Sequence, residues 1–224
     1  MTDTNIIEAY KSIENVLSKS SRPLVAFSGG KDGFVTAYLC NKVWPGIEMV
    51  CEASFYFDIQ KEDINLSAER HSFNLTCKES LTDQWLLKHP QVIFSPESKV
   101  RAWSFHARQQ KTVKAFARQI KADVSIYGRR TEENSVPKEL YTTKEGLQFH
   151  PLRSWSTNQI WSFFDGIREP KPRIYSYRFG ALEGNAPFYS LNSKGKNMDE
   201  CWDIVNEIDE KRLFEFKFRE SCIN

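Results

Sequence analysis

The stretch Val25-Ala26-Phe27-Ser28-Gly29-Gly30-Lys31-Asp32-Gly33-Phe34-Val35 constrains the fold more than any other part of the chain. The apolar run at residues 24–27 predicts a buried strand, and the apolar residues after Gly33 recur at helical spacing. A glycine turn between a strand and a helix lets the backbone approach a phosphate, with the helix's first N–H groups pointing at it. The spacing is neither that of a Walker A loop nor Gly-x-Gly-x-x-Gly. We therefore expect an anion site with Lys31 and the Ser28 hydroxyl as added donors; an ordinary strand-to-helix turn is the alternative.

Strand and helix patterns alternate along the chain. Besides the first strand, we expect strands at residues 49–57, 92–94 and 123–127, and helices at 6–17, 62–73, 81–87, 100–120 and 198–214. This alternation predicts an α/β fold with a doubly wound, mostly parallel five-stranded sheet flanked by helices. Ligands of such sheets bind beyond the carboxyl ends of the strands, where Ser28, Asp58 and Gly128 would all lie. We expect residues 1–168 to form the ligand-binding domain and residues 169–224 an irregular lid or tail packed on it.

Composition narrows the class of protein. The 224 residues are 40% hydrophobic with a net charge of +2, which is typical of a globular domain and argues against a general nucleic-acid coat. Nine basic residues stand against Asp123 alone between positions 99 and 130, a pattern that favours a solvated helix face over a platform for a nucleic-acid backbone. Neither a signal peptide nor a membrane span is evident. Five scattered cysteines without a Cys-x-x-Cys pair indicate reduced thiols in a cytoplasm, with no iron–sulfur cluster.

Two further motifs follow the last predicted strand. The first is Gly128-Arg129-Arg130-Thr131-Glu132, whose two guanidiniums at a strand end could grip phosphate or sulfate oxygens; a solvated loop end is the alternative. The second is Phe149-His150-Pro151-Leu152-Arg153-Ser154-Trp155-Ser156, which leads into a helix that Ser156 is expected to cap. His150 could contact a ligand or, as a histidine before a proline, simply order the loop.

These three motifs, in this order, resemble the phosphoadenylyl-sulfate (PAPS) reductase family of the PP-loop, or adenine-nucleotide alpha-hydrolase-like, superfamily. The resemblance covers about two-thirds of the chain, from Ser28 to Phe164. It implies a Rossmann-like fold and an adenine nucleotide, ATP or PAPS, as ligand. One departure is Gly33, which stands where the family usually has a serine that donates to a phosphate.

The resemblance also implies roles for individual residues. The implied nucleotide-binding residues are Ser28, Gly29, Gly30, Lys31, Asp32, Gly33, Asp58, Gly128 and His150. The implied catalytic residues are Lys31, Arg129, Arg130 and Cys222, and Asp32 would help to position a magnesium ion. Asp58 could equally be a plain turn residue.

Three kinds of chemistry remain open. The leading one is reaction at the alpha phosphate of ATP, by pyrophosphate release or adenylyl transfer, which needs positioning and charge neutralisation more than a covalent nucleophile. The second is PAPS reduction to sulfite, with Cys222 as nucleophile and thioredoxin or glutaredoxin as partner; the residues around Cys222 differ from the family's tail motif. The third is a catalytically silent nucleotide-binding subunit, which Gly33 and the altered tail suggest. The oligomeric state is open, and a homodimer is compatible with the sequence.

Overall fold

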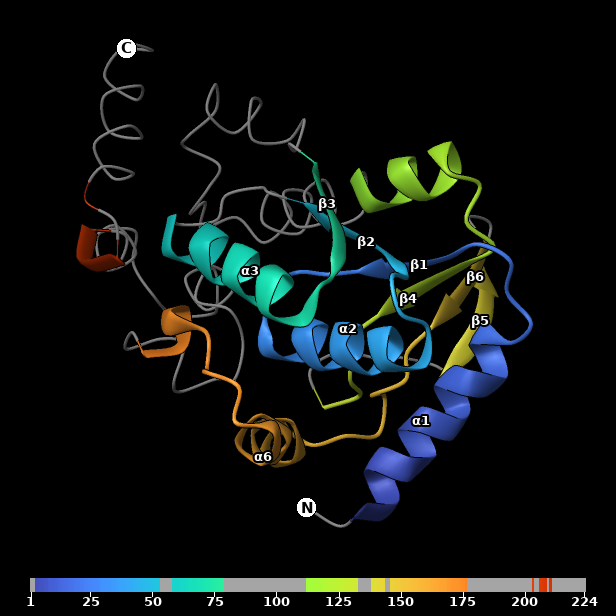
Figure 1. Ribbon diagram of the computed structural model, residues 1–224, viewed down its shortest axis with the longest axis horizontal. Coiled ribbons are helices and arrows are strands. Elements are labelled where there is room, and N and C mark those ends of the chain that lie inside the picture. The colour runs from blue at the N-terminus through green and yellow to red at the C-terminus, as the bar shows by residue number, and fades with distance from the viewer. Residues whose placement is uncertain are drawn as a thin grey trace, which may run out of the picture. The chain divides into compact units, whose positions relative to one another are not determined.

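The computed structural model describes residues 3–52, 58–78, 112–132, 138–143 and 146–176, together with 203, 206–208 and 210 (Figure 1). Its elements are α1 (Asp3–Leu17), β1 (Pro23–Ala26), α2 (Lys31–Val43), β2 (Glu48–Glu52), α3 (Asp58–His71), β3 (Asn74–Lys78), a helix over residues 112–119, β4 (Val124–Tyr127), β5 (Leu140–Thr143), β6 (Gly146–Phe149), α6 (Thr157–Ile167) and the 3₁₀ helix η2 (Arg173–Ser176).

The described strands form one sheet in the order β3-β2-β1-β4-β6-β5. All neighbouring pairs are parallel except β5 and β6, which are antiparallel. The chain winds outward from β1 to β3 and then returns to place β4 on the other side of β1, so the strand order reverses between β1 and β4. The predicted doubly wound, mostly parallel α/β fold is confirmed, but the sheet has six strands rather than the five predicted.

Three strands escaped the sequence-based prediction. β3 reads Asn-Leu-Thr-Cys-Lys, and this half-polar run at the sheet edge carries a weak strand signal. β5 and β6 form a short hairpin of mostly half-exposed residues. Neither strand contains an apolar run, so the strand signal in the sequence is unclear for them as well. The expected strand at residues 92–94 and the helix at 81–87 lie outside the described residues.

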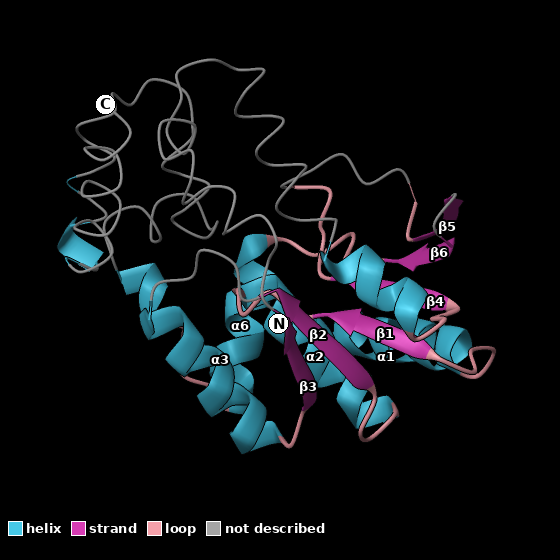
Figure 2. Ribbon diagram, turned by 90° about the horizontal axis from the view of Figure 1, so that it is seen from above, coloured by secondary structure: helices cyan, strands magenta, loops and turns pink. Residues whose placement is uncertain are grey.

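Helices cover both faces of the sheet (Figures 1 and 2). On one face, Val113, Phe116 and Ala117 of the 112–119 helix pack on Leu24 and Val50. On the other, α2 contacts β1 and β4 and is itself packed against α1 and α6. An aromatic cluster joins these helices: the Phe34 ring lies 4.8 Å from that of Phe164 and 6.2 Å from that of Phe73, between ring centroids. The sequence pattern of alternating elements therefore folds as two helix layers around a buried sheet.

The observed end of the second strand differs from the predicted one, and this difference affects the candidate site. The second strand stops at Glu52, residues 53–57 lie outside the described part, and Asp58 is the first residue of α3 rather than the last of a strand. In contrast, Ser156 caps α6 as predicted: its hydroxyl accepts from the Gln159 backbone N–H at 3.3 Å, and the Gln159 side chain accepts from the Ser156 N–H at 2.6 Å. This reciprocal capping box fixes where α6 begins.

The chain divides into two compact units. The first comprises residues 1–52, 63–78 and 113–172 and holds the whole described sheet; the second comprises 53–62, 79–112 and 173–224. Within the second unit, the Arg173 guanidinium donates to the Ile59 carbonyl at 3.2 Å and pairs with Glu62 at 2.8 Å. The predicted boundary at residue 168 stays a prediction.

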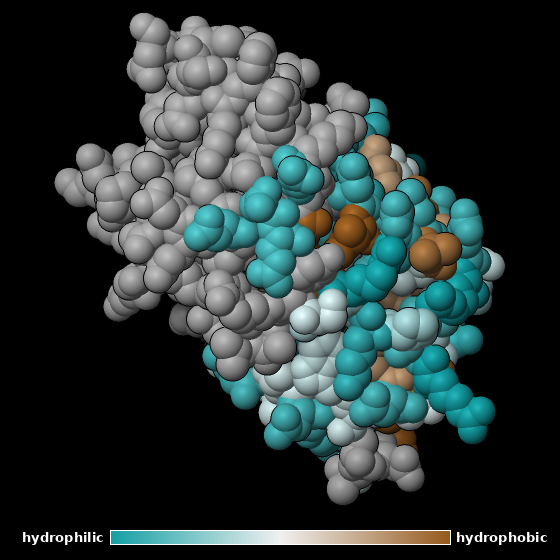
Figure 3. Space-filling model, turned by 90° about the vertical axis from the view of Figure 1, so that its left-hand side faces the viewer, coloured by the Kyte–Doolittle hydropathy of each residue, from teal (hydrophilic) through white to brown (hydrophobic). Residues whose placement is uncertain are grey.

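The face of the molecule in Figure 3 is mostly hydrophilic where its residues are described. On the face in Figure 3, hydrophobic side chains are separated by hydrophilic ones. Large hydrophobic residues that are exposed, among those described, are Ile7, Trp44, Leu66 and Leu140. Such scattered residues are ordinary on a globular protein. Among the described residues, no helix has the length and apolar character that crossing a membrane requires.

Candidate functional site

The loop between β1 and α2 has the backbone form that its glycines allow. Gly29 has a φ of +70°, and a Cβ at this position would lie 2.3 Å from Cγ1 of Ile64, so both backbone conformation and space require glycine here. Gly30 is the N-cap of α2 in an extended conformation, and no side chain accepts a hydrogen bond there as a cap. The loop therefore leads into a helix start whose first backbone N–H groups have no partner within the helix.

The end of β4 closes on this helix start. A Cβ on Gly128 would lie 2.5 Å from the Asp32 carbonyl oxygen and 2.9 Å from the Gly33 nitrogen, so any larger residue would push the segment after β4 away from α2. A Cβ on Gly33 would lie 2.8 Å from the Ser28 hydroxyl oxygen. Ser28, Gly33 and Gly128 thus meet at the point where the strand order reverses, which is where ligands of doubly wound sheets bind.

Buried charged side chains surround this point. Lys31 and Arg130 are 1% and 0% exposed, and both bind Asp32. The Lys31 ammonium lies 2.7 Å from Oδ2 of Asp32, and Nε of Arg130 donates to Oδ1 at 2.6 Å. Because a buried charge is costly unless it is paired, Asp32 is the group that allows both cations to lie inside the protein.

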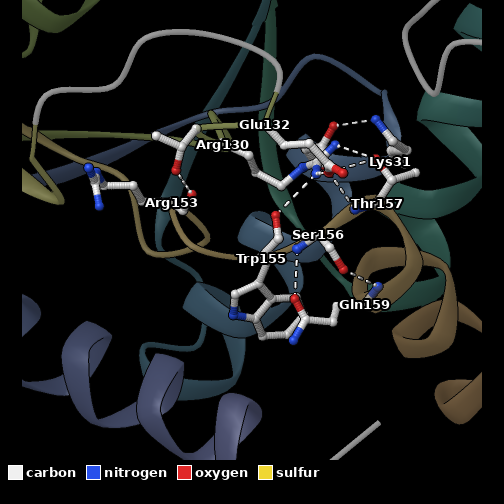
Figure 4. A network of polar contacts seen from close by, with 10 residues as sticks. Lys31, Arg130, Glu132, Arg153, Trp155, Ser156, Thr157 and Gln159 are labelled. Atoms are coloured by element: carbon white, nitrogen blue, oxygen red, sulfur yellow. Dashed lines mark hydrogen bonds and ion pairs between the residues drawn. The ribbon is translucent and has the colours of Figure 1, made fainter.

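Arg130 extends the network to α6 (Figure 4). Its NH1 donates to Glu132 and, at 3.1 Å, to the Trp155 carbonyl, and its NH2 donates to the Thr157 hydroxyl at 3.1 Å. Glu132 in turn accepts from the Thr157 backbone N–H at 2.6 Å and from its hydroxyl at 2.9 Å. The hydrogen bonds from Arg130 and Thr157 lower the pKa of Glu132, which therefore stays ionised at the N-terminus of α6.

A second link ties the same two segments together. Thr131 donates to the Arg153 carbonyl from its backbone N–H at 2.9 Å and from its hydroxyl at 2.6 Å. The segment after β4 is therefore held to α2 through Arg130 and to the turn before α6 through Thr131 and Glu132. One guanidinium connects all three pieces of backbone around the loop.

His150 lies apart from this network, in an aromatic sandwich. Its ring stacks on Tyr127 and Tyr141 at centroid distances of 5.7 and 5.5 Å, and its Nε2 lies 3.3 Å from the Tyr141 hydroxyl. Burial is the main reason that the pKa of His150 falls to about 4, and the nearby charge of Arg129 adds to it, while the Tyr127 backbone opposes the shift. At neutral pH this histidine is therefore an uncharged ring inside the protein, and its contact with a nucleotide stays a prediction.

The structure brings together most, but not all, of the residues predicted from the sequence. The residues that meet around the loop are Ser28, Gly29, Gly30, Lys31, Asp32, Gly33, Gly128 and Arg130. Arg129 is half-exposed, with its guanidinium 5.4 Å from the Tyr127 ring centroid, and Asp58 is exposed and pairs with Lys61 at 3.3 Å. Cys222 lies outside the described residues.

Sequence reasoning missed two members of the network, Glu132 and Thr157. Both were visible in the motifs, since Glu132 follows the arginine pair and Thr157 follows the helix cap. Their pairing across 25 residues required the fold, because the segment with Glu132 follows β4, the segment with Thr157 follows β6, and these two strands are parallel neighbours in the sheet.

The described residues do not, as they stand, form a magnesium site. Both oxygens of Asp32 are occupied by cationic side chains, Lys31 and Arg130. Nor does the described part of the chain contain a cluster of three or more histidine, cysteine, aspartate or glutamate residues suited to a metal. Magnesium in nucleotide sites is commonly held by one or two carboxylates together with phosphates. Asp32 as a metal-positioning residue therefore stays a prediction, and no step below depends on it.

Fold and site together define a class of protein: a doubly wound α/β domain with a glycine-rich loop where its strand order reverses. No protein-family model matches the sequence, and a comparison with curated proteins finds no match either. Solved structures do match. The chain is similar to a phosphoadenylyl-sulfate reductase from Candida auris, solved as a phosphate complex, with a TM-score of 0.59 and 11% identity over 79% of this chain and 92% of that one.

It is also similar to an NH3-dependent NAD synthetase from Campylobacter jejuni subsp. jejuni, solved with a nitrate ion. That match has a TM-score of 0.58 and 12% identity, and covers 95% of each chain. At these identities the similarity shows the fold alone. Both solved structures therefore share the predicted α/β fold with this chain, and the PP-loop superfamily implied by the sequence motifs stays a prediction.

Proposed function

We propose that this chain binds an adenine nucleotide at the loop after β1 and reacts at its alpha phosphate. The observation that carries the proposal is the position of that loop. It lies where the strand order reverses, with Gly29 in a conformation that favours glycine and the start of α2 behind it. The two solved structures support the proposal because one acts on a sulfated adenine nucleotide, PAPS, and the other is an NAD synthetase.

In this proposal the phosphates bind the N–H groups at the start of α2 and the ammonium of Lys31. An acceptor oxygen attacks the alpha phosphorus, the bond to the beta phosphate breaks, and pyrophosphate leaves. Lys31 is paired with Asp32, so a phosphate must compete with that carboxylate for the ammonium. Arg130 stays bound to Asp32 in the meantime, so Asp32 keeps a cationic partner when Lys31 turns to the phosphate.

Arg130 is best assigned as a positioning residue. Its donors are directed at Asp32, Glu132, Trp155 and Thr157, and its side chain is 0% exposed. It would act on the reaction by holding Asp32, and through it Lys31, in place. Direct phosphate contact by Arg129 or Arg130 stays a prediction.

The decisive experiment measures two products in parallel. Purified protein is incubated with magnesium and ATP and assayed for pyrophosphate, and with PAPS and reduced thioredoxin and assayed for sulfite. We expect pyrophosphate from the first reaction, and at least a hundredfold loss of it in Lys31→Ala, because one removed charge-stabilising donor typically costs that much. Lys42→Ala, an exposed lysine at the other end of α2, is the matched control and should keep the rate within about twofold.

The second candidate function is PAPS reduction. The observation in its favour is the match to a PAPS reductase over 92% of that chain. Sulfite formation that disappears in Cys222→Ser would replace our proposal with this one. ATP binding without either product would leave a silent nucleotide-binding subunit, and absence of nucleotide binding would reject all three.

A further inference from the structure

Two cysteines on neighbouring strands face each other at the edge of the sheet. Cys51 on β2 and Cys77 on β3 are partners in the parallel register, and β3 is the outermost of the described strands at that edge (Figure 2). Neighbouring strands lie about 4.8 Å apart, and a disulfide requires Cα atoms roughly 4.4–6.8 Å apart. The two backbones are therefore already at a separation that a disulfide can bridge.

The two side chains also project from the same face of the sheet. Successive residues of a strand alternate between faces, and Val50 packs with the 112–119 helix. Lys78 reaches the same helix, with its ammonium 5.0 Å from the Phe116 ring centroid. Cys51 and Cys77, one residue from Val50 and Lys78 respectively, therefore both point to the opposite face.

The pair combines a protected thiol with an accessible one. Cys51 is buried and Cys77 is exposed. A hydrogen bond from the Cys51 thiol lowers the pKa of Cys77 to about 6, against the opposing effect of partial burial. Cys40 on α2 is the contrast: it is buried, and burial raises the pKa of its thiol. Of these cysteines, only Cys77 has the accessible thiolate that attacks disulfides.

From the register, the shared face and the accessibility, we propose that Cys51 and Cys77 form a reversible thiol–disulfide site that reacts with small-molecule disulfides such as glutathione disulfide. Nothing in the proposed nucleotide chemistry uses either residue. The site lies one residue from the carboxyl ends of β2 and β3, so its oxidation would cross-link the edge of the sheet.

The reaction balances with glutathione disulfide as oxidant. The Cys77 thiolate attacks one of its sulfurs, a Cys77–glutathione disulfide forms, and one glutathione thiolate leaves. Cys51 then gives up its proton, its thiolate attacks the Cys77 sulfur, and the second glutathione leaves as a thiolate. Two protein thiols become one disulfide, one glutathione disulfide becomes two glutathione thiols, and excess reduced thiol drives the reverse.

Peptide mapping tests the connectivity. The full-length protein is equilibrated with glutathione disulfide, its free thiols are alkylated, and trypsin releases Cys51 in residues 43–61 and Cys77 in residues 71–78. We expect these two peptides to be joined by a disulfide that dithiothreitol removes. The Cys201→Ser control should give the same cross-link, and Cys51→Ser should leave Cys77 joined to glutathione.

Alkylation rates test the chemistry without any disulfide forming. The rate at which iodoacetamide modifies Cys77 should rise with pH around a midpoint near 6, and in Cys51→Ala, which has no side-chain donor, the midpoint should move toward about 8.5. If the Cys51 variants do not fold, the alkylation midpoint and the peptide map of the wild type still test the proposed thiol–disulfide site. Cys77 joined to another cysteine or to a second chain, no cross-link at all, or a wild-type midpoint near 8.5 would each overturn the proposal.

Discussion

At each end of the paired strands β1 and β4, one carboxylate connects the segments that flank the two strands. The groups that it binds differ between the two ends. At the amino end, Asp123 accepts from the Ser20 hydroxyl, from the Ser21 N–H at 2.5 Å and from the Arg22 N–H at 3.1 Å. At the carboxyl end, Asp32 binds the ammonium of Lys31 and the guanidinium of Arg130. The amino end uses uncharged donors at an exposed aspartate, whereas the carboxyl end uses two cations that are almost completely buried.

We infer from this difference that the connection at the amino end is structural and that the one at the carboxyl end serves the proposed nucleotide site. Hydrogen bonds at the surface hold a turn at little desolvation cost. Buried ion pairs are, by contrast, weak evidence for stability, since well-packed apolar residues often do as well. Stability alone therefore does not explain the buried charges at the carboxyl end. We infer that they hold the Lys31 ammonium in position at the start of α2. The predictions below test the comparison.

The largest effect should come from removing the buried guanidinium. Arg130→Met removes the guanidinium that donates to Asp32 and to the Trp155 carbonyl, and we expect the free energy of unfolding to fall by about 3–5 kcal/mol. Arg129→Met, its half-exposed neighbour, is the matched control and should cost less than about 1 kcal/mol. Urea unfolding measures both. Equal losses of unfolding free energy in the two variants would mean that the buried contacts of Arg130 add no more stability than the half-exposed Arg129 does.

His150 should make this end of the sheet sensitive to acid. Its pKa is about 4 in the folded protein and about 6.5 when unfolded, so the unfolded chain binds more protons between these values and stability falls as pH decreases. We expect a loss of about 2 kcal/mol between pH 7 and pH 5 from this residue, with its contribution exhausted below pH 4.

The measurement is the difference in unfolding free energy between pH 7 and pH 5, in the wild type and in His150→Phe. The variant keeps an aromatic ring between Tyr127 and Tyr141 and removes the titrating group. Its pH dependence should be smaller than that of the wild type by the stated amount. An unchanged pH dependence would show that His150 is protonated as readily in the folded protein as in the unfolded chain.

At the amino end, losing the carboxylate should affect stability alone. Partial burial raises the pKa of Asp123, but the hydrogen bonds from Ser20, Ser21 and Arg22 outweigh it and lower this pKa to about 2. Asp123→Ala removes these bonds, and we expect a loss of about 1–2 kcal/mol in urea unfolding. ATP affinity, measured by calorimetry, should stay within about twofold. A large loss of ATP affinity in Asp123→Ala would show that the two ends of the strand pair do not act separately.

Sequence patterns predicted the contacts at the carboxyl ends of β1 and β4 better than those at their amino ends, for a physical reason. A strand, a glycine turn and a helix are encoded by neighbouring residues, so the loop from Ser28 to Gly33 and the cap at Ser156 could be found locally. Asp123 binds residues about a hundred positions earlier, and Glu132 reaches Thr157 because β4 and β6, the strands before them, are neighbours in the sheet. The buried state of Arg130 was likewise out of reach, because an arginine after a strand looks the same in a sequence whether it faces solvent or an aspartate.

Gly33 should give the smallest effect and the most local test. Serine at this position would place its Cβ 2.8 Å from the Ser28 hydroxyl oxygen and 3.1 Å from the Ser28 nitrogen, so the Ser28 side chain would have to turn away. Serine is otherwise better than glycine inside a helix by roughly 0.5 kcal/mol. We expect Gly33→Ser to lower the unfolding free energy by about 0.5–1 kcal/mol, the contact outweighing the helix preference.

A double-mutant cycle with Ser28→Ala isolates that contact. With the hydroxyl gone, Gly33→Ser should cost less by about 0.5 kcal/mol or more, which is a measurable coupling between the two positions. Gly166→Ser is the matched control, because a Cβ on this glycine of α6 meets nothing within 4 Å, and it should be neutral or slightly stabilising. Additive effects at positions 28 and 33 would mean that the two residues do not touch. The carboxyl end would then be looser around its loop than the close approach of Ser28, Gly33 and Gly128 implies.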